Sequence, residues 1–384
     1  MKYLRLIGYV LYVLLAVEAG LQGFYYATSG SWLFKRNPNA LPIFQTNGQF
    51  GHALKPNLAY RHATNEFDVQ LYTNSQGFRT SAARAQYRPV KDESTYRILL
   101  LGPSFAFGWG VNYEETFGSR LEGYLKEAKF ANGRRIELIN AGVPALGLAN
   151  QLRWFDADAK NLTPDLVVQF VYASLVLPSD EAGSAYAYDV TPEGYLKKRF
   201  PEPGERIRNF LKQFATVHYS WIIYTLIASR IDGTAAEGKI IGAGRELTQQ
   251  SNFEPSSPEW TRSMAIYEHL NESVRAAQGR LLIVYFPLSY AVHPQDKARW
   301  KHLGVTDVEG MKTFNEKACS YLNTRGIACL NIEHDLTEEV QRSAERLYYW
   351  LDVHWTPTGN RIAAEAVARH LVRGEHRLQA RGGE

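Results

Sequence analysis

Three side chains of this sequence have the types needed for a nucleophile, a base and an orienting acid. Ser104 stands in GPSFAFGWGV, directly after an apolar run, and Asp352 and His354 stand two residues apart in WLDVHWTPTGN. A serine hydroxyl attacks a carbonyl carbon when a histidine takes its proton and a carboxylate holds that histidine, whatever their order in the chain. We therefore predict an acyl-transfer site with Ser104 as nucleophile, His354 as base and Asp352 as orienter.

Taken alone, a serine after Gly-Pro is usually a turn residue, so the prediction depends on the elements that bring the three together. Five short, nearly continuous apolar runs predict strands that are covered on both faces. They are RILLLG (97–102), RIELINAG (135–142), DLVVQFVY (165–172), RLLIVYF (280–286) and GIACLNI (326–332). Helical segments alternate with these runs, which predicts a three-layer α/β fold around a parallel sheet of about five strands.

The candidate residues all follow strand ends. Ser104 follows the first predicted strand, NAGVPALG (140–147) the second, YASLV (172–176) the third, and WLDVHWTPTGN (350–360) the fifth. Ligands of open parallel sheets bind beyond the carboxyl ends of the strands, so we expect these segments to meet there. Thr356 is predicted to cap a following amphipathic helix with Pro357 in its first turn, which would hold the preceding loop rigid.

The N-terminus is long and apolar enough to cross a membrane. Leu6 to Ala27 contains 22 residues, which as a helix reach about 33 Å, and Lys2 and Arg5 before it favour a cytoplasmic N-terminus. We expect an uncleaved anchor, with a cleaved signal peptide as the alternative. Glu18 is costly in lipid, so it is expected near the headgroups or hydrogen-bonded to a partner helix.

The remaining pattern predicts three regions. They are a transmembrane anchor (1–29), an extended or β segment (30–96) with a strand and turn in FDVQLYTNSQGFRT (67–80), and an α/β domain (97–384) with a helical insertion at about 176–260. A helix is predicted over 206–231 in that insertion. Its aromatic and apolar residues are expected to pack over the sheet, with a docking face for a protein or membrane as the alternative: Tyr219, Trp221, Ile222 and Tyr224.

Composition argues against several function classes. The 43 basic and 39 acidic residues are scattered, with no basic and aromatic tract for nucleic acid. The glycines near Ser104 lack the Lys-Ser/Thr of a phosphate loop, and the histidines show no ligand spacing, so we expect no nucleotide, metal or other cofactor.

Cys319 and Cys329 are expected to be buried and unpaired, with a disulfide as the alternative in an oxidising compartment. Arg79 is expected to be solvated, with contact to an anionic substrate as the alternative.

Four segments in this order and spacing, GPSFAFGWGV, NAGVPALG, PDLVVQFVY and LDVHWTPTGNRIAAEA, resemble the four blocks of the SGNH (GDSL) hydrolase superfamily. TNSQGFR (73–79) is similar to a segment of its membrane-anchored exported members, and the D-x-H-W form resembles the branch with polysaccharide O-acetylation proteins. The resemblance implies a flavodoxin-like sheet. It also implies the roles given above to Ser104, His354 and Asp352.

The chain departs from the family pattern in three places. Pro103 replaces the Asp before the nucleophile, Ala145 stands where the second block has its oxyanion-hole glycine, and Ala173–Ser174 stand for the Asn-Asp of the third. Backbone N–H groups of Ser104 and Ala145 are expected to serve as oxyanion donors, with Ser174 substituting for the asparagine. Loss of one such donor typically costs about 10²–10³ in rate.

Two functions therefore stay open. The first is a membrane-anchored, periplasm-facing esterase or O-acyltransferase that acts on envelope carbohydrate. The second is a catalytically degraded SGNH protein that serves as an accessory subunit of an inner-membrane complex. Both place the anchor in the inner membrane as a single span and the main domain outside the cytoplasm.

Overall fold

The computed structural model describes residues 2–29, 32–35, 41–64, 66–172, 188–199, 210–231, 258–300, 308–343 and 345–381, with 204 and 207 as isolated positions. The chain forms two compact units. One comprises Met1–Pro42 with Tyr188–Gly238, and the other comprises Ile43–Ala187 with Lys239–Glu384. The second unit contains all the candidate site residues that the structure describes.

The second unit is built on an eight-stranded sheet with the order β12-β11-β8-β6-β7-β5-β4-β3. The five predicted strands form its parallel part: β6 (Thr95–Leu101), β7 (Arg135–Asn140), β8 (Leu166–Val171), β11 (Arg280–Tyr285) and β12 (Ala328–Asn331). Their order is the flavodoxin-like 2-1-3-4-5, which reverses direction between β6 and β8. The α/β prediction is confirmed.

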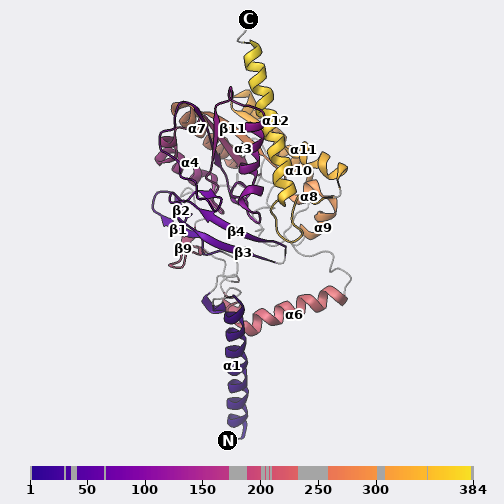
Figure 1. Cartoon of the computed structure of the whole chain (residues 1–384). Helices are drawn as coiled ribbons and strands as arrows, with labels where there is room; N and C mark the ends of the chain where they lie inside the picture. The colour runs from indigo at the N-terminus through magenta and orange to yellow at the C-terminus, as the bar shows by residue number, and fades with distance from the viewer. Residues whose placement is uncertain are drawn as a thin grey trace. The chain divides into compact units, whose positions relative to one another are not determined.

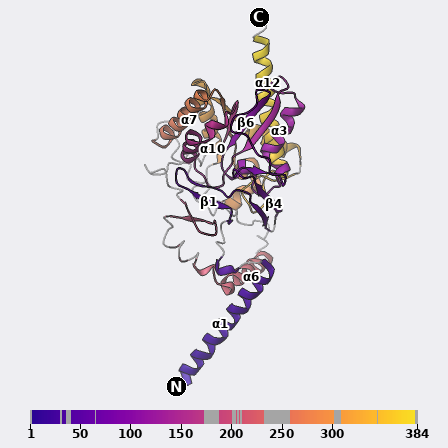
Figure 2. The ribbon, with the colours of Figure 1, turned by 60° about the vertical axis from the view of Figure 1, so that its left-hand side comes forward.

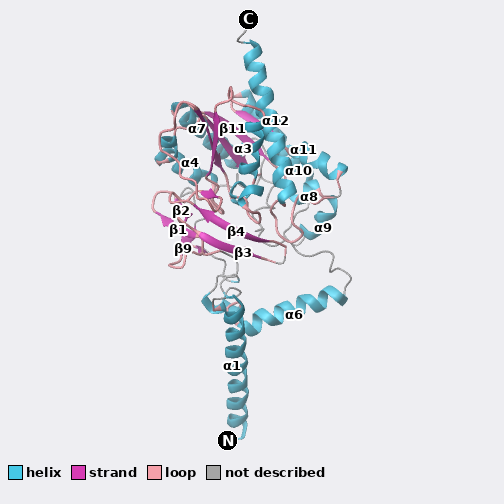
Figure 3. Cartoon of the chain, in the orientation of Figure 1, coloured by secondary structure: helices cyan, strands magenta, loops and turns pink. Residues whose placement is uncertain are grey.

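The sheet is larger than the expected five strands because three antiparallel strands extend its β7 edge (Figure 3). They are β3 (Ala59–Ala63), β4 (Asp68–Thr73) and β5 (Arg79–Thr80), and β5 pairs with β7 through Arg79 and Asn140. β4 alternates between buried and exposed residues, as predicted for a half-buried strand. A separate hairpin, β1 (Phe44–Asn47) with β2 (Gly51–Leu54), precedes them.

Helices cover both faces of this sheet (Figure 2). α3 (Phe117–Glu127) and α12 (Pro357–Arg381) pack together on one side, and α7 (Pro258–Ala276) and α10 (Val308–Thr324) lie on the other, where α4 (Leu148–Ala157) packs on α7. The core between the layers is almost wholly apolar, with β6 and β8 buried along their full length. The short elements are α2 (Ser104–Phe107), α8 (Ser289–Val292), α9 (Lys297–Trp300), α11 (Glu333–Arg342), and the 3₁₀ turns η2 (Tyr113–Glu115), η3 (Ala159–Leu162) and η8 (Pro294–Asp296).

Cys319 of α10 and Cys329 of β12 form a disulfide. The expectation of two unpaired thiols was wrong. The sequence places the residues ten apart, but the tight turn between α10 and the parallel strand β12 brings them face to face. A disulfide is typical of an extracytoplasmic protein.

The first unit contains α1 (Lys2–Ser29), η1 (Leu33–Lys35), α6 (Ala215–Ile231) and the hairpin of β9 (Tyr188–Val190) with β10 (Leu196–Lys198). α6 packs against α1, and Figure 1 shows the two helices meeting at an angle. The helix predicted over 206–231 is interrupted at residues 212–214. α6 therefore begins at Ala215, where the Glu18 carboxylate accepts bonds from the Ala215 and Thr216 N–H groups (2.7 and 2.9 Å).

The expected packing of the insertion over the sheet is also wrong for Tyr219. Its ring lies against Phe24 of α1 and joins a small cluster around Tyr25, Leu33 and Ala215. Tyr224 is exposed, and the side chains of Trp221 and Ile222 lie outside the described residues. The apolar character of α6 thus serves a contact with α1.

Candidate active site

Ser104 lies at the end of the most buried strand because the chain turns sharply there. After Leu101 of β6, Gly102 adopts a φ of +152°, and a Cβ at this glycine would lie 2.8 Å from the Cβ atoms of Ala106 and Phe170. Only glycine fits this close approach. Pro103 follows and Ser104 opens α2, so its backbone N–H has no acceptor within the helix.

Asp352 and His354 lie in the loop before α12, which is held from both ends. Tyr348 and Trp355 form an isolated antiparallel bridge across the loop. Thr356 Oγ1 accepts a bond from the Gly359 N–H (3.2 Å), which is the predicted cap of α12. The backbone that carries Asp352 and His354 is therefore held in place on both sides of the pair.

The structure brings the three predicted side chains into one hydrogen-bonded chain. His354 Nε2 lies 2.6 Å from Ser104 Oγ, and His354 Nδ1 lies 2.5 Å from Asp352 Oδ1, which also accepts the His354 backbone N–H at 3.0 Å. Ser104 and His354 stand 250 positions apart in the sequence. With Nδ1–H donated to the carboxylate, Nε2 is the nitrogen that can accept the serine proton.

Two effects act on Asp352. Burial alone would raise the pKa of its carboxyl group, but the charge and hydrogen bonds of His354, with a smaller contribution from His62, hold that pKa below its usual value. Asp352 is therefore ionised at neutral pH, as a carboxylate that orients a histidine must be.

Of the expected oxyanion donors in the second and third blocks, the structure describes Ala145 but not Ser174. Ala145 is exposed and has a φ of +60°, the left-handed region that favours glycine, so it occupies a glycine-like position in the loop after β7. That loop is fixed near Ser104: Asn140 donates to the Ala106 carbonyl and accepts from the Gly142 N–H (2.9 and 3.1 Å). Ser174 lies outside the described residues.

A residue that the sequence analysis missed, Glu66, holds the Asp352 loop. Its two carboxylate oxygens accept the backbone N–H groups of Leu351 (2.9 Å) and Asp352 (2.8 Å). Glu66 comes from the turn between β3 and β4, so the antiparallel extension of the sheet reaches the site. A carboxylate that binds main-chain amides has no spacing signature in sequence, and nothing in the pattern pointed to it.

Aromatic rings surround the His354 imidazole. Phe105 lies 4.8 Å from it and Trp109 lies 5.6 Å from it, measured between ring centroids. Trp109 also contacts His62, which lies 4.7 Å away and acts electrostatically on Asp352. His62 reaches the site because β3 joins the sheet edge beside it.

Arg79 is likewise not the solvated residue expected. It is fully buried, and its guanidinium donates to the main-chain carbonyls of Tyr72, Thr80, Gln70 and Val111. Burial lowers its pKa to about 10, so it stays charged at neutral pH. Arg79 ties the sheet extension to the loop after Gly110 and is a structural residue.

Residues 244–384 match the family model of the SGNH hydrolase-like domain of the acetyltransferase AlgX. This segment contains Asp352 and His354, which the structure joins to Ser104 at the switch point of a flavodoxin-like sheet. Residues 244–384 therefore match an SGNH hydrolase-like domain. No curated protein matches it in sequence.

Solved structures resemble this chain distantly. A candidate lipolytic protein of the G-D-S-L family from Desulfitobacterium hafniense is 14% identical, with 71% of this chain and 98% of that chain covered and a TM-score of 0.37. An acetylxylan esterase of Geobacillus stearothermophilus is 12% identical (72% and 94% covered, TM-score 0.39). LAE5, an alpha/beta hydrolase from the metagenome of Lake Arreo, is 11% identical (72% and 96%, TM-score 0.36).

Within the part of the chain that the structure describes, no group of three His, Cys, Asp or Glu side chains could hold a metal ion. The side chains that meet at the candidate site supply a hydroxyl, an imidazole and a carboxylate. This set is suited to acyl transfer.

Proposed function

We propose that this protein is a membrane-anchored, extracytoplasmic SGNH-type ester hydrolase or O-acetyltransferase that acts on envelope carbohydrate. The observation that carries the proposal is the chain of short hydrogen bonds from Ser104 through His354 to Asp352. The AlgX family model, whose description names an acetyltransferase, supports acetyl as the transferred group.

The proposed reaction has two halves. His354 Nε2 takes the proton of Ser104 Oγ while that oxygen bonds to the ester carbonyl carbon. The resulting oxyanion accepts hydrogen bonds from the backbone N–H groups of Ser104 and Ala145. The carbon–oxygen bond to the donor alcohol then breaks, and His354 returns the proton to that alcohol, which leaves acyl-Ser104.

In the second half, His354 deprotonates water or a sugar hydroxyl, and that oxygen attacks the acyl carbon. Attack by water gives the free acid, whereas attack by a sugar hydroxyl gives a new ester. In both cases the bond between the acyl carbon and Ser104 Oγ then breaks, and His354 gives the proton to that oxygen. The same residues thus serve hydrolysis and transfer, and the second nucleophile decides which occurs.

Membrane anchoring is supported by α1. Over Lys2–Thr28 it is long and apolar enough to span a bilayer, and its 18-residue window with a mean hydropathy of 1.8 is unburied within the protein. Its Glu18 and Gln22 make tertiary bonds to α6 and to the Gln213 carbonyl. A segment with bonds to the folded insertion is more consistent with a retained anchor than with a removed signal peptide. The disulfide favours an extracytoplasmic main domain.

An accessory role in an inner-membrane complex is the second candidate function. It is favoured by the exposed apolar side chains of α6: Val217, Ile223, Tyr224 and Ile227. Such a surface fits a partner protein or the lipid interface. In this role Ser104 would be unreactive, since the family's third-block asparagine is absent.

Covalent labelling tests the two functions against each other. The full chain, extracted in mild detergent, is treated with a fluorophosphonate probe and assayed with a chromogenic acetyl ester. An active site gives labelling and turnover that Ser104→Ala removes, with a loss of at least roughly 10³ in rate, while the control Ser119→Ala retains both. Absence of labelling, together with co-purification of a membrane partner, would support the accessory role instead.

A further inference from the structure

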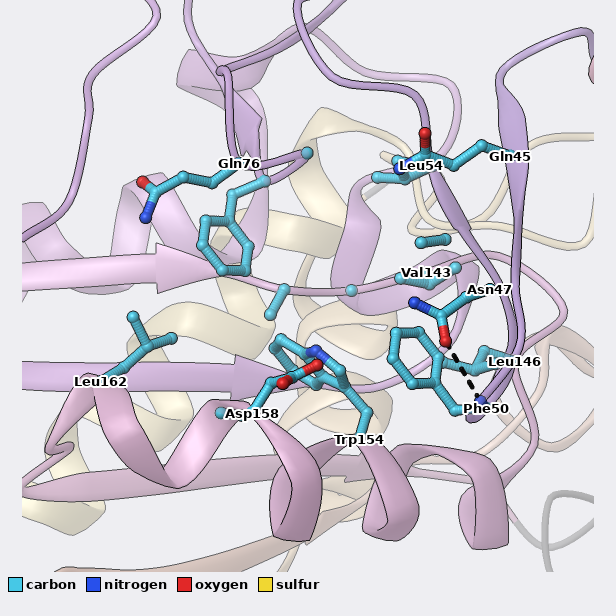
Figure 4. Close-up of a pocket in the computed structure, with 16 residues that line it drawn as sticks. Gln45, Asn47, Phe50, Leu54, Gln76, Val143, Leu146, Trp154, Asp158 and Leu162 are labelled. Carbon is cyan, nitrogen blue, oxygen red and sulfur yellow. Dashed lines mark hydrogen bonds between the residues drawn. The ribbon is translucent and has the colours of Figure 1, made fainter. Parts of the chain in front are cut away.

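A cavity of about 280 Å³ lies in the α/β unit apart from Ser104, Asp352 and His354. It is enclosed by the β1–β2 hairpin, the turn before β5, the loop after β7, and α4 with η3. Figure 4 shows side chains from all of these around one space. Pockets for drug-sized ligands usually hold about 300–1,000 Å³, so this cavity suits one compact ring.

Three aromatic rings frame the cavity. Trp154 of α4 lies 6.3 Å from Phe50 and 6.1 Å from Phe78, with the planes of both pairs inclined at about 60°. Phe50 and Phe78 are buried, whereas Trp154 is only half-buried. The two phenylalanines therefore fix the indole while part of it stays accessible. The electron-rich face of an aromatic ring attracts the weakly positive C–H groups of a ligand.

Polar groups at the same cavity have unused hydrogen-bonding capacity. Within the described part of the chain, no partner is found for the Trp154 indole N–H, the Asp158 carboxylate, the Gln45 amide or the Asn47 Nδ2. Asn47 Oδ1 accepts the backbone N–H groups of Gln49 and Phe50, which fixes the Asn47 side chain in the hairpin. The cavity thus offers both donors and acceptors from two separate elements.

These features indicate the chemistry of the ligand. A pyranose ring presents C–H groups on its face and hydroxyls at its edge, which match the indole face and the surrounding amide and carboxylate groups. Among the described residues that line the cavity, Asp158 is the only charged one. Within the described part of the chain no ion pair is found for Asp158. A carboxylate that is not paired with a cation would repel a uronate, but it accepts hydrogen bonds from neutral sugar hydroxyls. We propose that this cavity binds a neutral pyranose unit of a polysaccharide.

The cavity shares a structural element with the candidate active site. Ala141, Gly142, Val143 and Leu146 line it, and they flank Ala145 in the loop after β7. A Cβ at Gly142 would lie 2.3 Å from the Phe107 backbone nitrogen, so the loop lies directly against α2, which begins at Ser104. If the proposed function holds, the bound unit belongs to the acceptor or donor polysaccharide. The binding itself does not depend on that function.

Equilibrium binding to the full chain in detergent tests the proposal separately from catalysis. The probes are the tetramers of cellulose, xylan and chitin, with tetragalacturonate as the charged counterpart, and the readouts are calorimetry and Trp fluorescence. At least one neutral tetramer should bind, and tetragalacturonate should bind more weakly. Ser104→Ala should leave binding unchanged, so a catalytically dead protein does not affect the result.

Variants locate the site. Trp154→Phe should weaken binding roughly 3- to 10-fold through the lost N–H, and Gln45→Ala by a similar factor, while Gln49→Ala on the exposed side of the same hairpin serves as the control. Asp158→Asn should reduce the preference for neutral sugars over tetragalacturonate, which a structural role for Asp158 would not do. The control Glu127→Gln should leave that preference unchanged.

The proposal is overturned by any of three results. They are the absence of binding by all three neutral tetramers, tighter binding of tetragalacturonate than of any neutral tetramer, and binding that neither Trp154→Phe nor Gln45→Ala weakens. If the wild-type protein binds a neutral tetramer but has no esterase activity, that result counts against the proposed function and not against the binding proposal.

Discussion

At the scale of single residues, the site depends on how Asp352 holds His354. The carboxylate accepts both the side-chain and the main-chain N–H of His354, so it fixes the position of the ring and the nitrogen that carries the proton. Asp352→Asn keeps the shape but favours the opposite tautomer. We expect kcat for an acetyl ester to fall by roughly 10²–10⁴. The same substitution in a protein that already carries Ser104→Ala should change the residual rate little. Steady-state kinetics check this, and an unchanged kcat would contradict the triad.

The same carboxylate gives a prediction for stability. Burial opposes ionisation of Asp352, but His354 outweighs it and lowers the pKa in the folded protein. A carboxyl whose pKa is lower when folded adds stability that is fully present above its unfolded value of about 3.9 and is lost as the pH falls through the folded value. The difference in unfolding free energy between wild type and Asp352→Asn should therefore shrink from pH 7 to pH 3. Urea denaturation at both pH values measures it, and a constant difference would refute the assignment.

Glu66 acts through the loop and not on the substrate. Glu66→Gln replaces one of its two carboxylate acceptors with an amide NH₂, which cannot accept the Leu351 or Asp352 N–H. We expect kcat to fall roughly tenfold with KM near the wild-type value, because small displacements of catalytic groups affect the chemical step most. Glu93→Gln, which is exposed, is the control. A change confined to KM would mean that Glu66 contacts substrate instead.

At the scale of elements, the loop after β7 must lie close to α2. Gly142 has no room for a side chain, since its Cβ would collide with the Ala106 and Phe107 backbone, whereas Gly147 has no atom within 4 Å of the corresponding position. Gly142→Ala should therefore lower the unfolding free energy by about 1–3 kcal/mol and reduce activity. Gly147→Ala, in the same loop, should cost only a few tenths of a kcal/mol. Equal effects in thermal unfolding would exclude the proposed close contact.

The parallel strands could be predicted because each one is apolar along its whole length. β8 is the clearest example: all six residues of LVVQFV are buried, including Gln169, whose amide bonds to Gln151. The alternating pattern of β4 likewise indicated a half-buried strand. It did not reveal the pairing of β5 with β7, because alternation shows which side chains face inward and not which strand lies beside them.

The site was predictable only where its chemistry has a sequence signature. The pair of Asp352 and His354 follows a motif, and α12 fixes it in place. The contribution of Glu66 and the burial of Arg79 depend on bonds to main-chain groups, which no residue pattern reports. The same reason hid the role of Glu18, whose partners are the first N–H groups of α6.

At the scale of the whole molecule, Glu18 links α1 to the insertion. Its carboxylate accepts hydrogen bonds from the backbone N–H groups of Ala215 and Thr216, from the Thr216 hydroxyl and from the Gln22 side-chain amide. From the sequence, this acid was expected near the headgroups or hydrogen-bonded to a partner helix. The helix it bonds is α6 of its own chain, which satisfies the acid without a second protein.

This contact predicts that α1 remains part of the mature protein. Removal of residues 1–27 would leave the α6 N–H groups without their acceptor, at a cost of about 1 kcal/mol or more. Intact mass spectrometry of the detergent-extracted protein should therefore find the full N-terminal helix. Glu18→Ala should speed hydrogen exchange and proteolysis around residues 212–216, while Glu18→Asp retains part of the protection. A mature chain that begins after Ala27 would show that α6 folds without this cap, and the anchor would then have to be reassigned as a signal peptide.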